Sequence, residues 1–293
     1  MSDTKKNKEK ILLGCEGGIG KNIAATGAVK VAHENGHVVD VLTAWPQIWE
    51  GNPHINKVYD WNRSEYFFEK IKAYDKVVLG DAYRHSHFLL GHTNLAGTYN
   101  YMLNKICEPA VPQIFLNKAE RLYVEGLLKD IEKPIMVVQT NGGLNEGYAW
   151  NRDLPLEEAV EVLNEFQDEY EIIHLRMPGQ LEIGGLKHTA ELNMRQCLVV
   201  LQMSSKRLLI DSVYQHAAAA LDLPASVLWV LTEPNKFGYE LHDNIMCNEP
   251  ELKNMDRLEG LFSGLDSDTS KCPFSQDQKI FDTKKIVESL NKK

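Results

Sequence analysis

A short apolar segment, a group of glycines and a helical segment follow one another near the start of the chain, and this order restricts the fold most. Residues 10–14 (KILLG) predict a buried strand, and the glycine loop GCEGGIGKN follows directly. Residues 22–32 repeat small apolar side chains at helical spacing, Asn35-Gly36 ends that helix, and residues 37–43 predict the next strand. Such an order predicts a βαβ unit with parallel strands.

The rest of the chain repeats this architecture without repeating the sequence. We expect helices over residues 156–170 and 213–221, and strands over residues 76–80, 135–140, 172–175, 207–211 and 226–231. A chain of 293 residues suits two domains of ordinary size. We therefore predict an α/β protein with two Rossmann-like domains, residues 1–132 and 133–275, followed by a polar helix over residues 276–293.

Composition argues against several classes of protein. Hydrophobic residues make up 43% and charged residues 25%, which is typical of a globular chain. A net charge of -9 gives no overall positive field, so a polyanionic partner would need a local basic patch. We expect no membrane span, because no apolar run is long enough, and the basic N-terminus does not resemble a signal peptide. The five cysteines form no CxxC pair, so we expect reduced thiols, a cytoplasmic location and no zinc site.

The glycine loop is similar to a phosphate-binding P-loop, and its spacing tests that hypothesis. Cys15 stands where the motif has its first glycine, and Asn22 stands where a Ser or Thr hydroxyl would bind Mg²⁺. The dinucleotide motif GxGxxG is absent, although Asp40 lies at a suitable distance for a ribose contact. Closely spaced glycines before a helix instead favour an anion or a closely fitted sugar, and the alternative is a helix packed tightly on its sheet.

Three stretches together resemble the ADP-heptose:lipopolysaccharide heptosyltransferases, which are inverting glycosyltransferases with the GT-B fold. The first joins GGIGKNIAATGAVKVA (residues 17–32) to VVDVLTAWPQIWEGNPHINKVYDW (residues 38–61). The second is LLIDSVYQHAAAALDLPASVLWVL (residues 208–231), and the third is EPNKFGY (residues 233–239). The resemblance implies two Rossmann-like domains facing across a cleft, with the acceptor on the first and the nucleotide sugar on the second. It also implies a C-terminal helix that packs back on the N-terminal domain, and a transfer that needs no metal and no other cofactor.

One departure from the family concerns the general base. The aspartate that the family carries in its glycine loop is Lys21 here, and a protonated lysine cannot accept the proton of the acceptor. Asp81 and His85 follow the strand 76–80, at the edge where open α/β sheets bind ligands. We therefore expect Lys21, Asp81 and His85 to be the catalytic residues. The alternative is a polar surface loop, and the HSH triplet has no third ligand for a metal.

The residues expected to bind the donor follow the family motifs and the ends of buried strands. Asp211 and Ser212 begin a helix whose amides suit a diphosphate, with Ser212 as its cap. His216 lies one turn further, where it either reaches a phosphate or forms hydrogen bonds in the core. The full donor set is Gly17, Gly18, Gly20, Asn141, Gly142, Arg152, Asp211, Ser212, His216, Glu233 and Lys236. For its charged members the alternative is an ordinary solvated position.

The resemblance implies a glycosyltransferase that moves a sugar from a nucleotide-diphosphate sugar to an acceptor hydroxyl with inversion. A glycan or lipopolysaccharide-type acceptor is the first interpretation. A second is a shortened bacteriophage-encoded relative that glycosylates hydroxymethylated cytosine in DNA, in the host cytoplasm. A third is a non-catalytic nucleotide-sugar binder, which the loss of the loop aspartate favours, or a P-loop-like ATPase.

Overall fold

The computed structural model divides into two compact units. It describes residues 8–63, 67–142, 147–248, 272, 274–275 and 278–292. The N-terminal unit is Met1–Asn117 and the C-terminal unit is Lys118–Lys293, so the division lies earlier than the expected residue 132. Helix α6 (Lys118–Leu127) belongs to the second unit because it packs on α8 (Met194–Met203), where Arg195 pairs with Glu120 through two hydrogen bonds.

The N-terminal unit contains a four-stranded parallel sheet with the order β3-β2-β1-β4. Its strands are β1 (Lys10–Cys15), β2 (Val38–Thr43), β3 (Lys57–Asp60) and β4 (Lys76–Leu79). Strand β1 is central, and after its first residue it is buried throughout, as expected for a parallel strand covered on both faces. Helix α1 (Ile19–Glu34) connects β1 to β2, so the predicted βαβ unit is confirmed.

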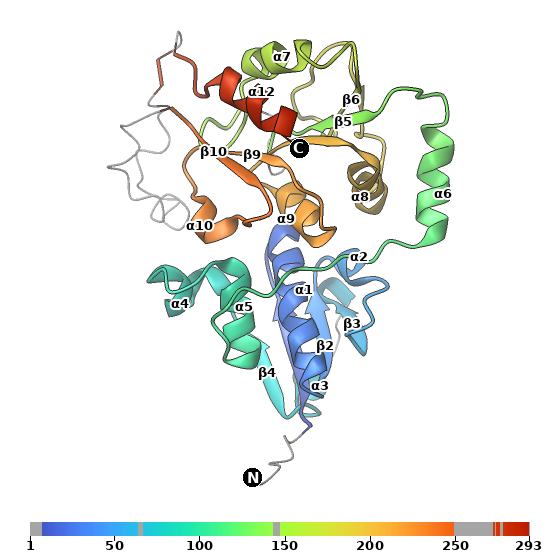
Figure 1. The fold of residues 1–293 in the computed structure, drawn as a ribbon. Coiled ribbons are helices and arrows are strands. Elements are labelled where there is room, and N and C mark those ends of the chain that lie inside the picture. The colour runs from blue at the N-terminus through green and yellow to red at the C-terminus, as the bar shows by residue number, and fades with distance from the viewer. Residues whose placement is uncertain are drawn as a thin grey trace. The chain divides into compact units, whose positions relative to one another are not determined.

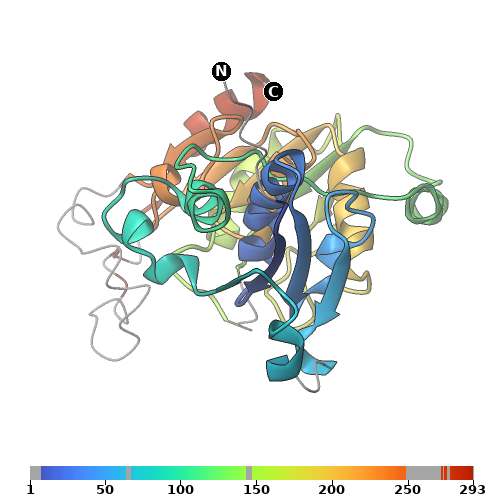
Figure 2. The same cartoon turned by 90° about the horizontal axis from the view of Figure 1, so that it is seen from below.

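Helices α1 and α5 (Leu95–Asn104) lie side by side over one face of this sheet (Figures 1 and 2). The backbone that follows α5 also passes close to α1, since a Cβ on Gly27 would lie 2.5 Å from the carbonyl oxygen of Val111. The short helices of this unit are α2 (Pro46–Trp49), η1 (Trp61–Arg63), α3 (Phe67–Ile71), η2 (Ala82–Arg84) and α4 (Ser86–Leu89).

The C-terminal unit contains a six-stranded parallel sheet with the order β10-β9-β8-β5-β6-β7. Its strands are β5 (Ile135–Val138), β6 (Glu171–His174), β7 (Lys187–His188), β8 (Lys206–Ile210), β9 (Ser226–Trp229) and β10 (Asp243–Met246). Figure 1 shows α7 (Leu156–Asn164) and α12 (Thr283–Lys292) on one face, and α8 and α9 (Val213–Ala220) on the other. Both units are therefore Rossmann-like, as predicted.

Helix α12 packs on the C-terminal unit, which differs from our expectation that it packs on the N-terminal domain. Its Ile286 and Leu290 are buried in the core of the C-terminal unit. Ser289 shares a hydrogen bond of 2.6 Å with Ser226 of β9, and the Lys206 ammonium donates to the carbonyl oxygen of Leu290. The apolar face of α12 is thus covered by the sheet of its own unit.

None of the helices in the described part of the chain has the length and apolar character that a membrane span requires.

Candidate functional site

The ends of β1 and β4 meet at the carboxyl edge of the N-terminal sheet. Lys21 stands in the first turn of α1, and Asp81 begins the loop after β4. The Nζ of Lys21 lies 2.7 Å from Oδ1 of Asp81 and 3.7 Å from the centre of the Tyr83 ring. The Asp81 side chain is 27% exposed and that of Lys21 only 12%, so the carboxylate is the more accessible partner. Two of the three predicted catalytic residues are therefore joined as an ion pair.

The glycine loop is shaped around the side chain of Lys21. Gly17 has a φ of +86°, and a Cβ there would lie 2.9 Å from Cδ of Lys21. A Cβ on Gly18 would meet no described atom within 4 Å, and no side chain caps the helix that begins after it. Gly20 lies in the first turn of that helix. Uncapped amides and open space at Gly18 give this loop the properties of an anion or sugar site.

Asn22 anchors the loop, a role that the sequence analysis did not identify. Its Nδ2 donates to the carbonyl oxygen of Gly18 at 3.2 Å. Its Oδ1 accepts hydrogen bonds from Thr43 Oγ1 at 2.5 Å and from Trp49 Nε1 at 3.0 Å. This buried amide occupies the position where a P-loop has a hydroxyl for Mg²⁺, so the loop lacks one chemical element of an ATPase site.

His85 is poorly suited to act as the general base. Its Nδ1 accepts a hydrogen bond of 3.2 Å from the backbone N–H of His87 and so caps α4. Burial lowers the pKa of His85, and the neighbouring His87 and Lys105 lower it further. The neutral ring then carries its proton on Nε2 and has no free nitrogen that can accept another.

In the described part of the chain, no group of three His, Cys, Asp or Glu side chains is arranged to hold a metal ion.

Three neighbouring strands bring predicted donor residues of the C-terminal unit to one edge of its sheet, whereas Gly17, Gly18 and Gly20 of the same predicted set lie in the N-terminal unit. Asn141 and Gly142 follow β5, Asp211 follows β8, and Glu233 comes after β9. Because the strands are parallel, their carboxyl ends share this edge. Thr232 Oγ1 donates a hydrogen bond to Asp211 Oδ2 and thereby links the ends of β8 and β9.

Asp153 organises the turn after β5 and was missed by the sequence analysis. Its Oδ1 accepts a hydrogen bond of 2.8 Å from the backbone N–H of Gly142. Its Oδ2 accepts from Asn141 Nδ2 at 3.1 Å and from the backbone N–H of Ala149 at 2.8 Å. Burial raises the pKa of Asp153, and these hydrogen bonds oppose that effect. The sequence feature that could have identified Asp153 is its position directly after Arg152, which was predicted to bind the donor.

Arg152 lies against the same turn. A Cβ on Gly142 would lie 2.5 Å from Cδ of Arg152, so the glycine makes room for the arginine. Burial raises the pKa of the Asp211 carboxyl, whereas the positive charge of Arg152 and the hydrogen bond from Thr232 lower it. Within the described residues, the guanidinium forms no ion pair and no hydrogen bond. Its planar set of N–H donors therefore suits a diphosphate.

Two predictions about α9 need correction. Ser212 precedes the helix but its side chain caps no amide, so the first turn of α9 has no side-chain cap. His216 is buried, with Nδ1 2.9 Å from Oη of Tyr239 and Nε2 3.0 Å from Nε2 of Gln215. Burial and, to a lesser extent, His242 lower the pKa of His216 to about 3. The structure thus favours the core interpretation of His216, because a neutral enclosed ring cannot neutralise a phosphate.

The last two predicted donor residues lie at the short helix α10 (Pro234–Phe237). Glu233 precedes this helix and Lys236 lies within it, and both are half-buried. The helix ends at Gly238, where a Cβ would lie 2.7 Å from the carbonyl oxygen of Pro234. Gly143, which the sequence groups with Asn141 and Gly142, lies outside the described residues.

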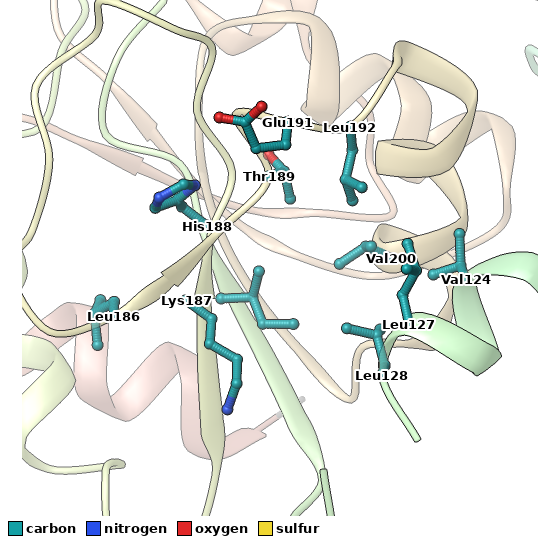
Figure 3. Close-up of a pocket in the computed structure, with 11 residues that line it drawn as sticks. Val124, Leu127, Leu128, Leu186, Lys187, His188, Thr189, Glu191, Leu192 and Val200 are labelled. Atoms are coloured by element: carbon teal, nitrogen blue, oxygen red, sulfur yellow. The ribbon is translucent and has the colours of Figure 1, made fainter. Parts of the chain in front are cut away.

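An apolar pocket of about 320 Å³ lies elsewhere in the C-terminal unit (Figure 3). It is bounded by α6, β7 and α8, and its apolar lining includes Leu127, Leu192 and Val200. Strand β7 is the edge strand and lies three strands away from β8. None of the predicted donor residues lines the pocket, so it is separate from the candidate donor site.

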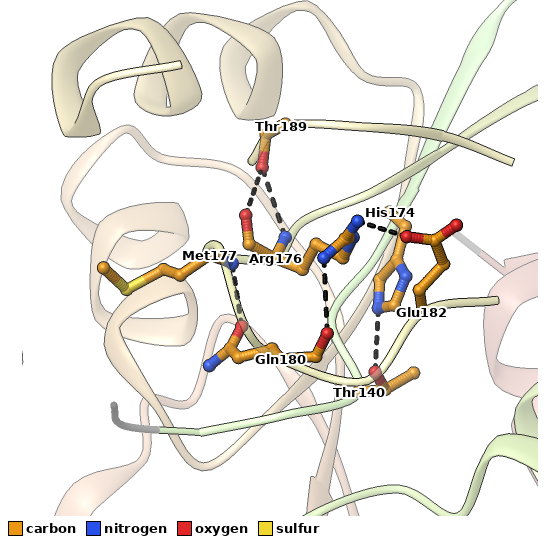
Figure 4. A network of polar contacts seen from close by, with 7 residues as sticks. All are labelled: Thr140, His174, Arg176, Met177, Gln180, Glu182 and Thr189. Atoms are coloured by element: carbon orange, nitrogen blue, oxygen red, sulfur yellow. Dashed lines mark hydrogen bonds and ion pairs between the residues drawn. The ribbon is translucent and has the colours of Figure 1, made fainter. Parts of the chain in front are cut away.

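A polar network supports the loop after β6 (Figure 4). The Arg176 guanidinium pairs with Glu182 within this loop. At the end of β6, Nε2 of His174 lies 2.8 Å from Oγ1 of Thr140, and the Thr140 hydroxyl donates to Oδ1 of Asn141 at 2.9 Å. Burial, reinforced by Arg176, lowers the pKa of His174 to about 4. A neutral histidine therefore donates to Thr140 and fixes the orientation of the candidate site residue Asn141.

Comparison with known proteins identifies the fold. No protein-family model matches the sequence, and no curated protein matches it significantly. A glycosyl transferase family 9 structure from Veillonella parvula aligns with a TM-score of 0.70 and 10% identity, covering 99% of this chain and 98% of that one. The E. coli ADP-heptose lps heptosyltransferase II aligns with a TM-score of 0.63 and 14% identity, covering 87% and 98%. E. coli heptosyltransferase WaaC, solved with ADP, aligns with a TM-score of 0.55 and 13% identity, covering 85% and 96%. The chain therefore has the GT-B fold of these glycosyltransferases.

Proposed function

We propose that the protein is a glycosyltransferase that moves a sugar from a nucleotide-diphosphate sugar to a hydroxyl of a glycan acceptor, with inversion and without a metal ion. The shared fold spans nearly the whole chain and supports this class. At 10–14% identity the fold does not carry the function, so the proposal rests on the residues at the two sheet edges.

The observation that carries the proposal is the ion pair between Lys21 and Asp81. The resembled family has an aspartate in the glycine loop, and this chain has a lysine there. The lysine binds the carboxylate of Asp81, so a carboxylate again lies beside the loop. A cation at the start of a helix opposes the helix dipole, and the carboxylate and the Tyr83 ring compensate for that placement. We assign Asp81 as the general base and Lys21 as the residue that positions it.

The proposed transfer is a direct displacement at the anomeric carbon. The acceptor oxygen forms a bond to this carbon while Asp81 receives the hydroxyl proton. The bond between the anomeric carbon and the phosphate oxygen breaks, and the diphosphate leaves with the electron pair. Arg152 and the uncapped amides at the start of α9 stabilise the charge that develops on it. Asp153 holds the turn against which Arg152 packs.

An ADP-sugar is the first donor to test, because WaaC was solved with ADP. We place the reaction in the cytoplasm, since the described cysteines are all free thiols.

Thermal unfolding with added nucleotides tests the donor site. ADP, UDP, GDP, CDP and ATP are added in turn, each with and without Mg²⁺. A diphosphate at ~100 times its dissociation constant should add about 2.7 kcal/mol to the free energy of unfolding. Arg152→Gln should abolish the shift, whereas Arg121→Gln, the same change on α6, should preserve it. A shift that appears only with ATP and Mg²⁺ would refute the proposal in favour of an ATPase.

The base assignment is tested by Asp81→Asn. Loss of a general base should lower kcat by roughly 10²- to 10⁴-fold, while the stabilisation by nucleotide stays unchanged. Asp75→Asn is the matched control, because Asp75 lies at the opposite end of the same strand and accepts a hydrogen bond from the backbone of Lys10. An Asp81→Asn variant that retains full activity would show that another group removes the proton.

A further inference from the structure

We infer that Trp45 stacks on a sugar ring of the acceptor, next to the general base. The inference rests on the proposed function and names a residue that binds its glycan acceptor. Trp45 comes two residues after β2, and β2 pairs with β1 along its whole length. Trp45 therefore lies at the same carboxyl edge of the sheet as the glycine loop and Asp81.

Two hydrogen bonds hold Trp45 against the glycine loop. The indole Nε1 donates to the carbonyl oxygen of Gly17 at 2.8 Å, and the backbone N–H donates to Thr43 Oγ1 at 2.9 Å. A Cβ on Gly17 would lie 3.1 Å from Nζ of Lys21, which itself contacts Asp81 at 2.7 Å. The indole and the proposed base are thus separated by one glycine and one ammonium group.

The faces of the Trp45 ring differ from those of other aromatic rings in this unit. The ring of Tyr83 is covered by the Lys21 ammonium, and that of Tyr101 by the imidazole of His87 at 3.7 Å. Trp49, four residues further on, is fully buried. Trp45 is half-buried, and in the described part of the chain no aromatic ring or ammonium group lies against it. The two hydrogen bonds therefore fix the orientation of the Trp45 ring, and no described aromatic ring or ammonium group covers its face.

The chemistry of an indole face suits a sugar ring. The axial C–H groups of a pyranose form an apolar, slightly positive surface, which complements the negative face of an aromatic ring. A nucleobase also stacks on tryptophan, so charge has to distinguish the two. Residues 1–117 contain thirteen lysines and arginines against twelve aspartates and glutamates, a net charge of only +1, which gives little attraction for a DNA backbone. The saccharide is therefore the acceptor that this unit favours.

Nuclear magnetic resonance of the indole N–H groups tests the inference in the full-length protein. Five tryptophans give five indole signals, and the one that Trp45→Phe removes belongs to Trp45. Methyl glycosides of glucose, galactose and mannose are added separately, and 5-hydroxymethyl-2′-deoxycytidine serves as the nucleobase probe. We expect the Trp45 signal to shift saturably with at least one glycoside. No shift with any glycoside, or a shift with the nucleoside alone, overturns the inference.

Two variants separate stacking from loop anchoring. Trp45→Phe keeps an aromatic face but loses the hydrogen bond to Gly17, and Trp45→Leu loses both. Ligand-detected saturation transfer should show glycoside affinity reduced about tenfold in Trp45→Leu and within about threefold of wild type in Trp45→Phe. Equal losses in both variants would mean that the indole only anchors the loop, and no loss in either would mean no role; both results overturn the inference.

Nucleotide binding distinguishes this inference from the proposed function. Trp45→Leu should keep the thermal stabilisation by nucleoside diphosphate, because the groups proposed to hold the diphosphate, Arg152 and the uncapped amides of α9, lie in the C-terminal unit. If the wild-type protein shows no such stabilisation, the proposed function fails, whatever the glycosides do. If it does and the glycosides leave Trp45 unaffected, only the stacking inference fails.

Discussion

Lowering the pH from about 7.5 to about 5 should destabilise the protein through His216 in particular. The ring is buried on α9 between Tyr239 and Gln215, and its folded-state pKa is lowered to about 3. An unfolded histidine titrates near 6.5. Because the folded pKa is the lower one, the contribution of His216 to stability is fully present above about pH 6.5 and is lost as the pH falls toward 3.

The two pKa values give the size of this loss. At about pH 5 an unfolded histidine is roughly 97% protonated, whereas a group with a pKa of about 3 is roughly 1% protonated. The difference in proton binding then corresponds to about 2 kcal/mol. His174, whose pKa is lowered to about 4, adds a comparable loss by the same mechanism.

Urea unfolding of the wild type and of His216→Gln at both pH values isolates this contribution. The glutamine cannot take up a proton, so its free energy of unfolding should fall by about 2 kcal/mol less than that of the wild type. Any destabilisation by the substitution itself cancels, because each protein is compared with itself. Identical pH dependence in wild type and His216→Gln would refute the argument that a neutral buried imidazole occupies this position.

Three further predictions concern packing and turns. Glu158→Ala removes the acceptor of two buried backbone amides just before α12 and should lower the free energy of unfolding in urea by about 2 kcal/mol. Gly27→Ala places a Cβ 2.5 Å from a backbone oxygen and should lower the melting temperature, whereas Gly126→Ala, on an open helix surface, should raise it. Asp153→Asn replaces a carboxylate oxygen with an amide that cannot accept a hydrogen bond, and should weaken nucleotide binding about tenfold in the thermal-shift assay.

The central strands and the edge strand β4 could be predicted from the sequence, whereas the edge strands β3, β7 and β10 could not. Strands such as β1 and β8 are covered on both faces, so each contains an uninterrupted apolar run, ILL in β1 and LLI in β8. Strand β3 and strand β10 each pair on one side only, and their sequences KVYD and DNIM carry no such run. Their pairing depends on a neighbouring strand, which local composition does not reveal.

The candidate site divides in the same way between local and long-range information. Gly17 could be identified as a site residue from the local sequence, because its left-handed φ and its contact with the Lys21 side chain involve only residues within one turn of the chain. Lys21 and Asp81 could be selected individually, but their contact spans 60 residues and exists because β1 and β4 are adjacent in the sheet.

His216 shows why a motif position alone can mislead. It matches the resembled family residue by residue, and only Tyr239, 23 residues later, shows that its ring is engaged in the core. The presence of Lys21 in place of the family aspartate can mislead in the other direction. Considered alone, Lys21 favours a protein without catalysis. The ion pair with Asp81, however, places a carboxylate beside the loop. A substitution at a catalytic position therefore has to be judged together with the residue that the fold places against it, and here that residue comes from the end of the adjacent strand.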